Sequence, residues 1–188
     1  RDSSTSRGLG DVYKRQPHDV YGLAKLMGGK KPFIDKLQMV FDEGLYDPAN
    51  EPDIAYAHLF SYFKGEEWRT QKETQRLLDK YFTTKPDGIP GNDDTGTMSS
   101  WAIFNMIGFY PDCPGLPEYT LTTPVFNKVT IRLDPKWYKE NELVIETNRT
   151  QPGTLYIDKV LLDGKKFNKY HITHDELVHG KYLKFDLK

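Results

Sequence analysis

The sequence predicts an α+β fold in which several helices precede a small antiparallel β-sandwich-like unit. Apolar residues recur at helical spacing up to residue 107, whereas from residue 128 onward they alternate with polar residues, which is typical of strands. A proline-rich segment between Pro111 and Pro124 separates the two patterns. We therefore place the helical part at residues 17–116 and the antiparallel β unit at residues 117–188.

Five helices are expected in the first part, the first ending at Gly28-Gly29, the second at Gly44 and the third at Gly65. The fifth begins at about Thr95 and is apolar nearly all round, which predicts burial on every side. Gly108 ends it. The residues that define the first four are Val20, Leu23, Ala24 and Met27; Phe33, Leu37, Val40 and Phe41; Tyr56, Leu59, Phe60 and Phe63; and Thr74, Leu77, Leu78, Tyr81 and Phe82.

Strands are expected where apolar residues recur at every second position, because alternate side chains of a strand face the same side. Asp163-Gly164 lies between two such runs and predicts a tight hairpin turn. The alternating residues are Val129, Ile131 and Leu133; Leu143 and Ile145; Leu155 and Ile157; and Leu183, Phe185 and Leu187.

The composition excludes several functions. Twenty-six basic and 27 acidic residues give a net charge of −1, which offers no electrostatic basis for binding nucleic acid or an anionic membrane. No apolar run is long enough to span a bilayer. The single cysteine, Cys113, cannot form an intramolecular disulfide, and its proline- and glycine-rich surroundings favour a structural role over a nucleophilic one.

An acidic loop, residues 87–96, holds the first candidate site. Gly88, Pro90 and Gly91 bend the chain just before Asn92, Asp93 and Asp94, and a helix follows. A carboxylate at a helix N-terminus is stabilised as its anion, which suits a general base or a group that binds hydroxyls or a cation. The simpler alternative is a capped turn with Asp94 as the N-cap. An EF-hand is excluded, because Gly91 and Ala102 would occupy ligand positions.

Three further groups of polar residues have two interpretations each. Asn50 and Glu51 offer hard oxygens that suit calcium, or they simply begin a helix. His18 and Asp19 contact a ligand or serve as a structural histidine and a helix cap. His171 and His174 have no ligand-spaced partners and are interpreted as packing or surface residues.

Four segments of the chain together resemble glycoside hydrolase family 92, whose members are calcium-dependent exo-acting α-mannosidases. The resemblance extends over nearly all of residues 17–188, in the family's order. Its residues are Asn92 to Trp101 with Gly108-Phe109-Tyr110-Pro111 and Cys113-Pro114-Gly115; Pro17-His18-Asp19 with Gly22-Leu23 and Met27-Gly28-Gly29; Asn50-Glu51-Pro52; and Val160-Leu161-Leu162-Asp163-Gly164 through His171-Ile172-Thr173-His174.

The resemblance implies a fold and a reaction. The helices would be the last ones of an (α/α)6 barrel, and the enzyme would hydrolyse terminal α-linked mannose with inversion. The family's acid glutamate lies upstream of Pro17, so this chain would supply only the base side and would need the missing N-terminal part as its partner. A mannose-containing glycan is the implied substrate, and a periplasmic or secreted parent protein is the implied location.

The resemblance also assigns residues. Asp94 matches the base, with Asp93 beside it, and Asn92 stands where some relatives carry a second acid. Asn92, His18 and Asp19 are the implied sugar contacts. Asn50 and Glu51 are the implied calcium ligands.

Two alternatives remain beside a hydrolase. A non-catalytic carbohydrate-binding or scaffolding module would bind mannosides, or nothing, without turnover. A phosphoryl-handling protein is disfavoured because no Lys or Arg lies between Gly88 and Trp101. Residues 1–16 are rich in Ser, Arg and Gly without apolar periodicity, and we interpret them as a non-native, disordered leader.

Overall fold

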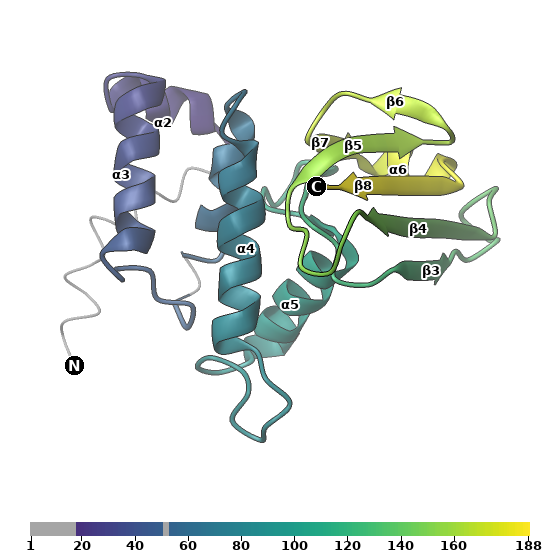
Figure 1. The fold of residues 1–188 in the computed structure, drawn as a ribbon, viewed down its shortest axis with the longest axis horizontal. Helices are drawn as coiled ribbons and strands as arrows, with labels where there is room; N and C mark the ends of the chain where they lie inside the picture. The colour runs from purple at the N-terminus through teal and green to yellow at the C-terminus, as the bar shows by residue number, and fades with distance from the viewer. Residues whose placement is uncertain (1–17, 51–52) are drawn as a thin grey trace.

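The computed structural model describes residues 18–50 and 53–188. Most helices lie on one side and the strands on the other, while the short helix α6 (His174–His179) lies among the strands (Figure 1). Helix α5 (Thr97–Ile107) runs from the lower end of α4 (Glu67–Tyr81) toward the strands. The helical elements are α2 (Val20–Leu26), α3 (Lys30–Asp42), η2 (Tyr56–Tyr62), α4 (Glu67–Tyr81), η3 (Asp94–Gly96), α5 (Thr97–Ile107) and α6 (His174–His179). The strands are β1 (Phe109–Tyr110), β2 (Glu118–Leu121), β3 (Lys128–Arg132), β4 (Glu142–Arg149), β5 (Ile157–Leu162), β6 (Lys165–Phe167), β7 (His171–Thr173) and β8 (Tyr182–Leu187).

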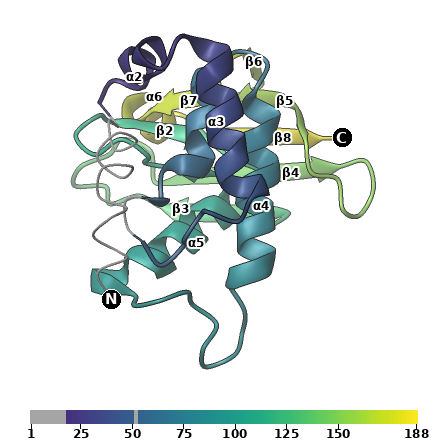
Figure 2. The ribbon, with the colours of Figure 1, turned by 90° about the vertical axis from the view of Figure 1, so that its left-hand side faces the viewer.

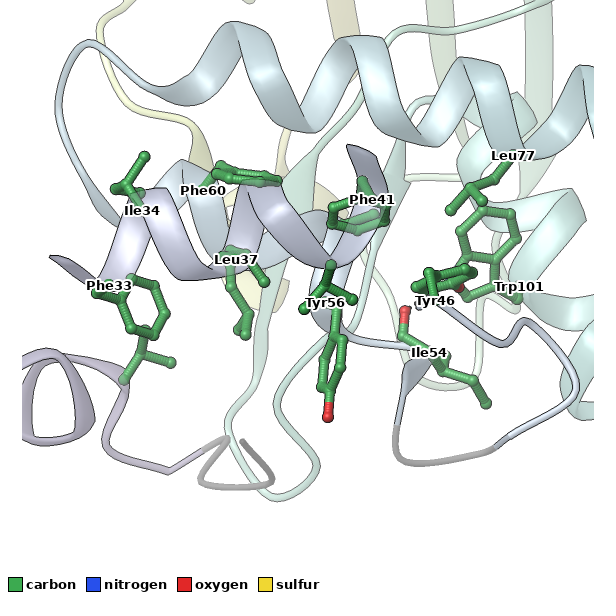
Figure 3. Packing of buried hydrophobic residues seen from close by; sticks show 14 of the residues in the cluster. Phe33, Ile34, Leu37, Phe41, Tyr46, Ile54, Tyr56, Phe60, Leu77 and Trp101 are labelled. Atoms are coloured by element: carbon green, nitrogen blue, oxygen red, sulfur yellow. Dashed lines mark hydrogen bonds between the residues drawn. The ribbon is translucent and has the colours of Figure 1, made fainter. Parts of the chain in front are cut away.

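The apolar stripes of the helices meet in one core, as their periodicity predicts. The stripe of α3 lies beside Phe60 of η2, and Leu77 of α4 meets Trp101 of α5 next to Tyr46 and Ile54 (Figure 3). Aromatic rings fill much of this core. The ring of Phe82 is stacked on that of Trp101, with 5.4 Å between the ring centroids. The helical layer therefore holds both loops that carry candidate residues against a single packed interior.

Two helical predictions are wrong in detail. The third helix is the 3-10 helix η2, a form that the apolar spacing alone does not distinguish from an α-helix. The fifth helix, α5, is not buried on every side, since Ile103 is 53% exposed. Its buried stripe is Met98, Trp101, Ala102 and Asn105, which lie on one face.

The strands form two sheets around a second core. The order is β1-β2-β7 in the smaller sheet and β3-β4-β8-β5-β6 in the larger one. Apolar residues of both sheets share one buried cluster, as a sandwich-like unit requires. The prediction of purely antiparallel pairing is wrong for one pair, because β8 returns through α6 and inserts between β4 and β5, parallel to β4. β1 precedes the expected boundary at residue 117.

The predicted hairpin turn is confirmed. Asp163 and Gly164 have φ angles of 49° and 78°, and Leu162 pairs with Lys165 across the turn. Two consecutive left-handed residues match the twist of the flanking strands.

Buried polar contacts join the helical layer to the sheets. The side-chain oxygen Oε1 of Gln71 in α4 accepts a hydrogen bond from the Ile157 amide of β5 at 2.9 Å. The buried carboxylate of Asp112 accepts from Tyr62 at 2.8 Å and from Thr120 at 2.6 Å. In the part of the chain that the structure describes, none of the helices has the length and apolar character that crossing a membrane requires.

Candidate functional site

The acidic loop reaches α5 through an unusual backbone turn. Thr95 has a φ angle of 57° and Gly96 one of 83°, so two consecutive residues are left-handed. Glycine adopts this conformation at little cost, but a β-branched threonine is strained there. Such strain persists only where the surroundings enforce it, and it concentrates at functional sites. The turn therefore marks residues 92–96 as a candidate site independently of their acidity.

The turn separates the roles of the two adjacent aspartates. The carboxylate of Asp93 accepts hydrogen bonds from the amide nitrogen of Ser99 at 2.8 Å and from its hydroxyl at 2.6 Å. Asp93 thus caps the first turn of α5. The prediction that Asp94 is the N-cap is wrong, because the left-handed residues 95 and 96 direct the first amides of α5 back toward Asp93. The Asp94 side chain is exposed.

The hydrogen bonds of Asp93 also affect its acidity. Hydrogen bonds from the Ser99 hydroxyl and amide lower the pKa of Asp93, because they stabilise its anion. A lowered pKa and an occupied carboxylate make Asp93 a poor proton acceptor. Asp94 is exposed to solvent at the start of η3, just before α5.

The acidic loop lies directly beside the loop that carries Asn50. A Cβ atom built on Gly91 would be 2.5 Å from the Cβ of Ala49, so only glycine permits this approach. The indole nitrogen of Trp101, in α5, donates to the backbone oxygen of Ile54 at 3.0 Å. The acidic loop and the Asn50 loop, about forty residues apart in the sequence, are therefore held together at two points, Gly91 against Ala49 and Trp101 to Ile54.

Asn50 is held by its own loop. Its side-chain nitrogen donates to Asp53 at 3.3 Å, while a second oxygen of Asp53 accepts from the Asp47 amide at 2.9 Å. The Asn50 side-chain oxygen is a hard donor of the kind calcium prefers, so Asn50 fits a calcium site as one ligand. Glu51 lies outside the described residues. Within residues 18–50 and 53–188, no three His, Cys, Asp or Glu side chains are grouped as metal ligands.

The remaining predicted sugar contacts fall into two places. Asn92 is exposed and adjoins Asp93 in the acidic loop. Asp19 caps α2 by accepting from the Gly22 amide at 2.7 Å, and His18 is exposed beside it. α2 is at the top of the helical layer in both Figure 1 and Figure 2, whereas the loop between α4 and α5 is at the bottom. The structure thus brings the loops of Asn92 and Asn50 into contact through Gly91 and Ala49 but leaves α2 at the other end of the layer.

The histidines of the β part serve packing, in agreement with the sequence. The Tyr119 hydroxyl bonds to the Nδ1 of His174 at 2.9 Å, and the His171 ring packs edge-on against Tyr62 at 4.6 Å. Burial lowers the pKa of His171. Cys113 is buried, and burial raises the pKa of its thiol, so it is no reactive nucleophile.

Sequence reasoning missed the buried polar residues behind the two loops. His58 and Asn105 are fully buried and hydrogen-bond to each other at 2.9 Å. Trp101 lies in the helix expected to be buried, and its N–H anchors the Asn50 loop. The available signal was polarity in otherwise apolar helical segments, because a buried polar side chain needs a partner.

A model of the glycosyl hydrolase family 92 catalytic domain matches residues 13–188. A secreted, uncharacterised glycosidase of Arthroderma benhamiae is 29% identical over 171 residues, which are 91% of this chain and 22% of that protein. A solved family GH92 alpha-mannosidase of Bacteroides thetaiotaomicron superposes with a TM-score of 0.83 at 32% identity. The superposed part is 92% of this chain and 23% of that protein.

Two further solved structures extend the comparison. The same alpha-mannosidase in complex with mannoimidazole superposes with a TM-score of 0.83 at 30% identity, covering 92% of this chain and 24% of its own. A family GH92 inverting mannosidase from the same species superposes with a TM-score of 0.80 at 30% identity. The superposed part is 94% of this chain and 27% of that protein. The chain therefore spans about a quarter of the length of these relatives.

Proposed function

Since this chain belongs to glycosyl hydrolase family 92, we propose that it forms part of an enzyme that removes terminal α-linked mannose from glycans with inversion. Its helices would be the last ones of an (α/α)6 barrel, with the β unit packed beside them. Solved relatives at 30–32% identity are described as an alpha-mannosidase, crystallised also with mannoimidazole, and as an inverting mannosidase. These descriptions support mannose as the sugar and inversion as the stereochemical course.

The observation that carries this proposal is the divergence of Asp93 and Asp94. Asp93 is committed to Ser99, so its role is to hold the loop in place. Asp94 keeps an exposed carboxylate next to the loop of Asn50. We therefore assign Asp94 as the general base and Asp93 as the residue that fixes its position.

In an inverting hydrolysis, two carboxyl groups act on opposite faces of the sugar, roughly 6.5–9.5 Å apart. Asp94 would accept a proton from a water molecule while the water oxygen bonds to the anomeric carbon. A carboxylic acid from the remainder of the enzyme would protonate the departing glycosidic oxygen. Asn92, exposed beside Asp93, would orient the water or a sugar hydroxyl through its amide.

Asn50 and Glu51 would hold a calcium ion with their side-chain oxygens. When bound, calcium would supply a fixed positive charge for vicinal sugar hydroxyls. The hydrogen bond from Asn50 to Asp53 supports this assignment, because it directs the amide nitrogen inward and leaves the oxygen for a ligand. Gly91 against Ala49 would keep this oxygen near the base.

His18 and Asp19 are assigned to the sugar through the family resemblance alone. The cap of α2 uses the Oδ1 atom of Asp19 and leaves Oδ2 for another contact. We also propose a secreted or periplasmic parent enzyme, which the description of the Arthroderma relative as secreted supports.

The test is hydrolysis by an enzyme that contains this chain together with the rest of the length of its relatives. We expect mannose release from an α-mannoside, loss of release on chelation, recovery with calcium, and β-mannose as the first product by NMR. The isolated 188-residue chain should be inactive, because the proposed acid would come from the rest of the enzyme. Mannoside binding without turnover by the assembled enzyme would favour a carbohydrate-binding module, and α-mannose as first product would contradict inversion.

A further inference from the structure

Two buried hydrogen bonds join η2 and the residues just before it to α5, the helix that follows the acidic loop. The first connects the Trp101 indole to the backbone oxygen of Ile54 at 3.0 Å. The second connects the Nε2 of His58 to the Oδ1 of Asn105 at 2.9 Å. Trp101 and Asn105 lie one turn apart on the same face of α5, whereas Ile54 precedes η2 and His58 lies within it.

The surrounding contacts determine the direction of the second bond. The amide nitrogen of Asn105 donates to the Trp101 backbone oxygen at 2.8 Å, so its Oδ1 faces His58 as an acceptor. His58 must therefore donate from Nε2. In the neutral ring, Nδ1 then carries only a lone pair. Asn105 also links the two bonds, because its own amide is fixed on Trp101.

The environment of His58 keeps the ring neutral and immobile. The side chain is fully buried, stacked on Tyr110 at 4.5 Å and edge-on to Trp101 at 6.0 Å. Asp112 is the buried carboxylate nearby, and its oxygens are engaged by Tyr62 and Thr120. Desolvation outweighs the field of Asp112 and lowers the pKa of His58.

The choice of histidine at this position has a cost. Among the described residues, the buried Nδ1 of His58 has no well-aligned hydrogen-bond partner, and the backbone carbonyls of Ala55 and Ile54 lie near the ring. A phenylalanine would fill similar space without an unsatisfied atom, so packing alone does not account for the residue. What histidine adds is one directional donor aimed at Asn105. A directional bond fixes the axial register of two packed elements, which apolar contacts leave adjustable.

We infer that His58 is a positioning residue that, through Asn105, sets the register of η2 against α5 and hence the spacing between Asn50 and Asp94. The inference rests on the proposed function of these two residues. His58 touches neither substrate nor ion. Its effect is geometric, and displacing a catalytic group by about 1 Å lowers a rate by roughly 10²-fold.

The test compares three variants in the assembled enzyme. His58→Phe removes the donor, and His58→Phe with Asn105→Leu removes both polar partners and restores an apolar contact. We expect both to lower kcat by about 10–100-fold. The double variant should keep a wild-type melting temperature, and His58→Gln, which retains a donor, should recover most of the rate. His174→Phe is the control, because that histidine lies in the β part and should leave kcat unchanged.

A readout besides activity separates this inference from the proposed function. Hydrogen exchange of the Ser99 amide reports the geometry of the acidic loop, because that amide is bonded to Asp93. If the double variant folds with wild-type stability, kcat and exchange, His58 is purely structural and the inference is overturned. If the wild-type enzyme shows no mannoside turnover, the proposed function fails. The exchange rate of the Ser99 amide then tests the positioning role of His58 by itself. Faster exchange in the double variant then supports positioning, and unchanged exchange overturns it.

Discussion

Gly91 lies directly against Ala49: a Cβ atom on Gly91 would come within 2.5 Å of the Cβ of Ala49. Gly91 also has a left-handed φ angle of 66°. Two requirements for glycine therefore coincide where the acidic loop meets the Asn50 loop. This contact makes one candidate site of two loops that the sequence separates.

The Gly91→Ala variant should be destabilised by both requirements. A left-handed alanine costs about 1 kcal/mol, and the clash with Ala49 adds roughly 1–3 kcal/mol, the usual cost of overpacking. Gly153→Ala is the matched control, because Gly153 has a φ angle of 82° and open space around its Cβ position. Urea unfolding of both variants of the chain measures the difference. Equal losses would show that the two loops do not depend on this contact.

Trp101→Phe should cost about 1–3 kcal/mol of unfolding free energy, the penalty for leaving the buried Ile54 carbonyl without its donor. Trp137→Phe is the control, since Trp137 is 72% exposed and surface substitutions usually stay within about 0.5 kcal/mol. Denaturant titration followed by circular dichroism gives both values. A Trp101→Phe variant as stable as the control would mean that this bond does not anchor the Asn50 loop.

Ser99→Ala should alter the acid dependence of stability. The pKa of Asp93 is lowered in the folded chain, so the unfolded chain binds the proton more readily. The resulting stabilisation is present above about pH 4, the ordinary range of an aspartate, and is lost as pH falls through the lowered pKa. Ser99→Ala removes the hydroxyl donor. Its melting deficit should therefore be largest above about pH 4 and shrink on acidification.

The neighbouring substitution Ser100→Ala controls this comparison, because Ser100 is exposed. Melting curves between about pH 2 and pH 7 cover the window in which an aspartate titrates. A deficit of Ser99→Ala that stays constant over this range would show that its hydroxyl does not act through the Asp93 charge.

Local patterns predict local structure well in this chain. The spacing of Phe33, Leu37 and Phe41 defines α3, and Asp163-Gly164 defines its hairpin, because each signal depends on neighbouring residues alone. The parallel pairing of β4 with β8 brings together segments about forty residues apart, and periodicity carries no information about such partners. The 3-10 form of η2 likewise has no separate signature in the apolar spacing.

The candidate site shows the same limit. The sequence identifies the acidic loop and the Asn50 loop, because turn-formers and carboxylates cluster there. It assigns the cap to Asp94 instead of Asp93, because a left-handed threonine at position 95 runs against that residue's preference. The contact between Gly91 and Ala49 is tertiary and has no local signature.

Removal of either proposed calcium ligand should raise the calcium requirement of the assembled enzyme. Asn50→Ala and Glu51→Ala each delete one hard oxygen, so the calcium concentration for half-maximal mannose release should rise by about tenfold or more. Gln38→Ala is the control, because that amide side chain lies between α3 and α4. Calcium titration of all three variants is the measurement. If both ligand variants need no more calcium than the wild-type enzyme, Asn50 and Glu51 do not bind calcium and serve only the structure of their loop.

The most direct test of the account is turnover of an α-mannoside by Asp94→Asn and Asp93→Asn in the assembled enzyme, with melting temperatures measured alongside. Asp94→Asn keeps the shape of the side chain but removes proton acceptance, so kcat should fall by roughly 10²–10⁴-fold, with melting unchanged because the side chain is exposed. Asp93→Asn should keep more activity and lose more stability, because its carboxylate caps α5. Near-normal turnover by Asp94→Asn would contradict its assignment as the base.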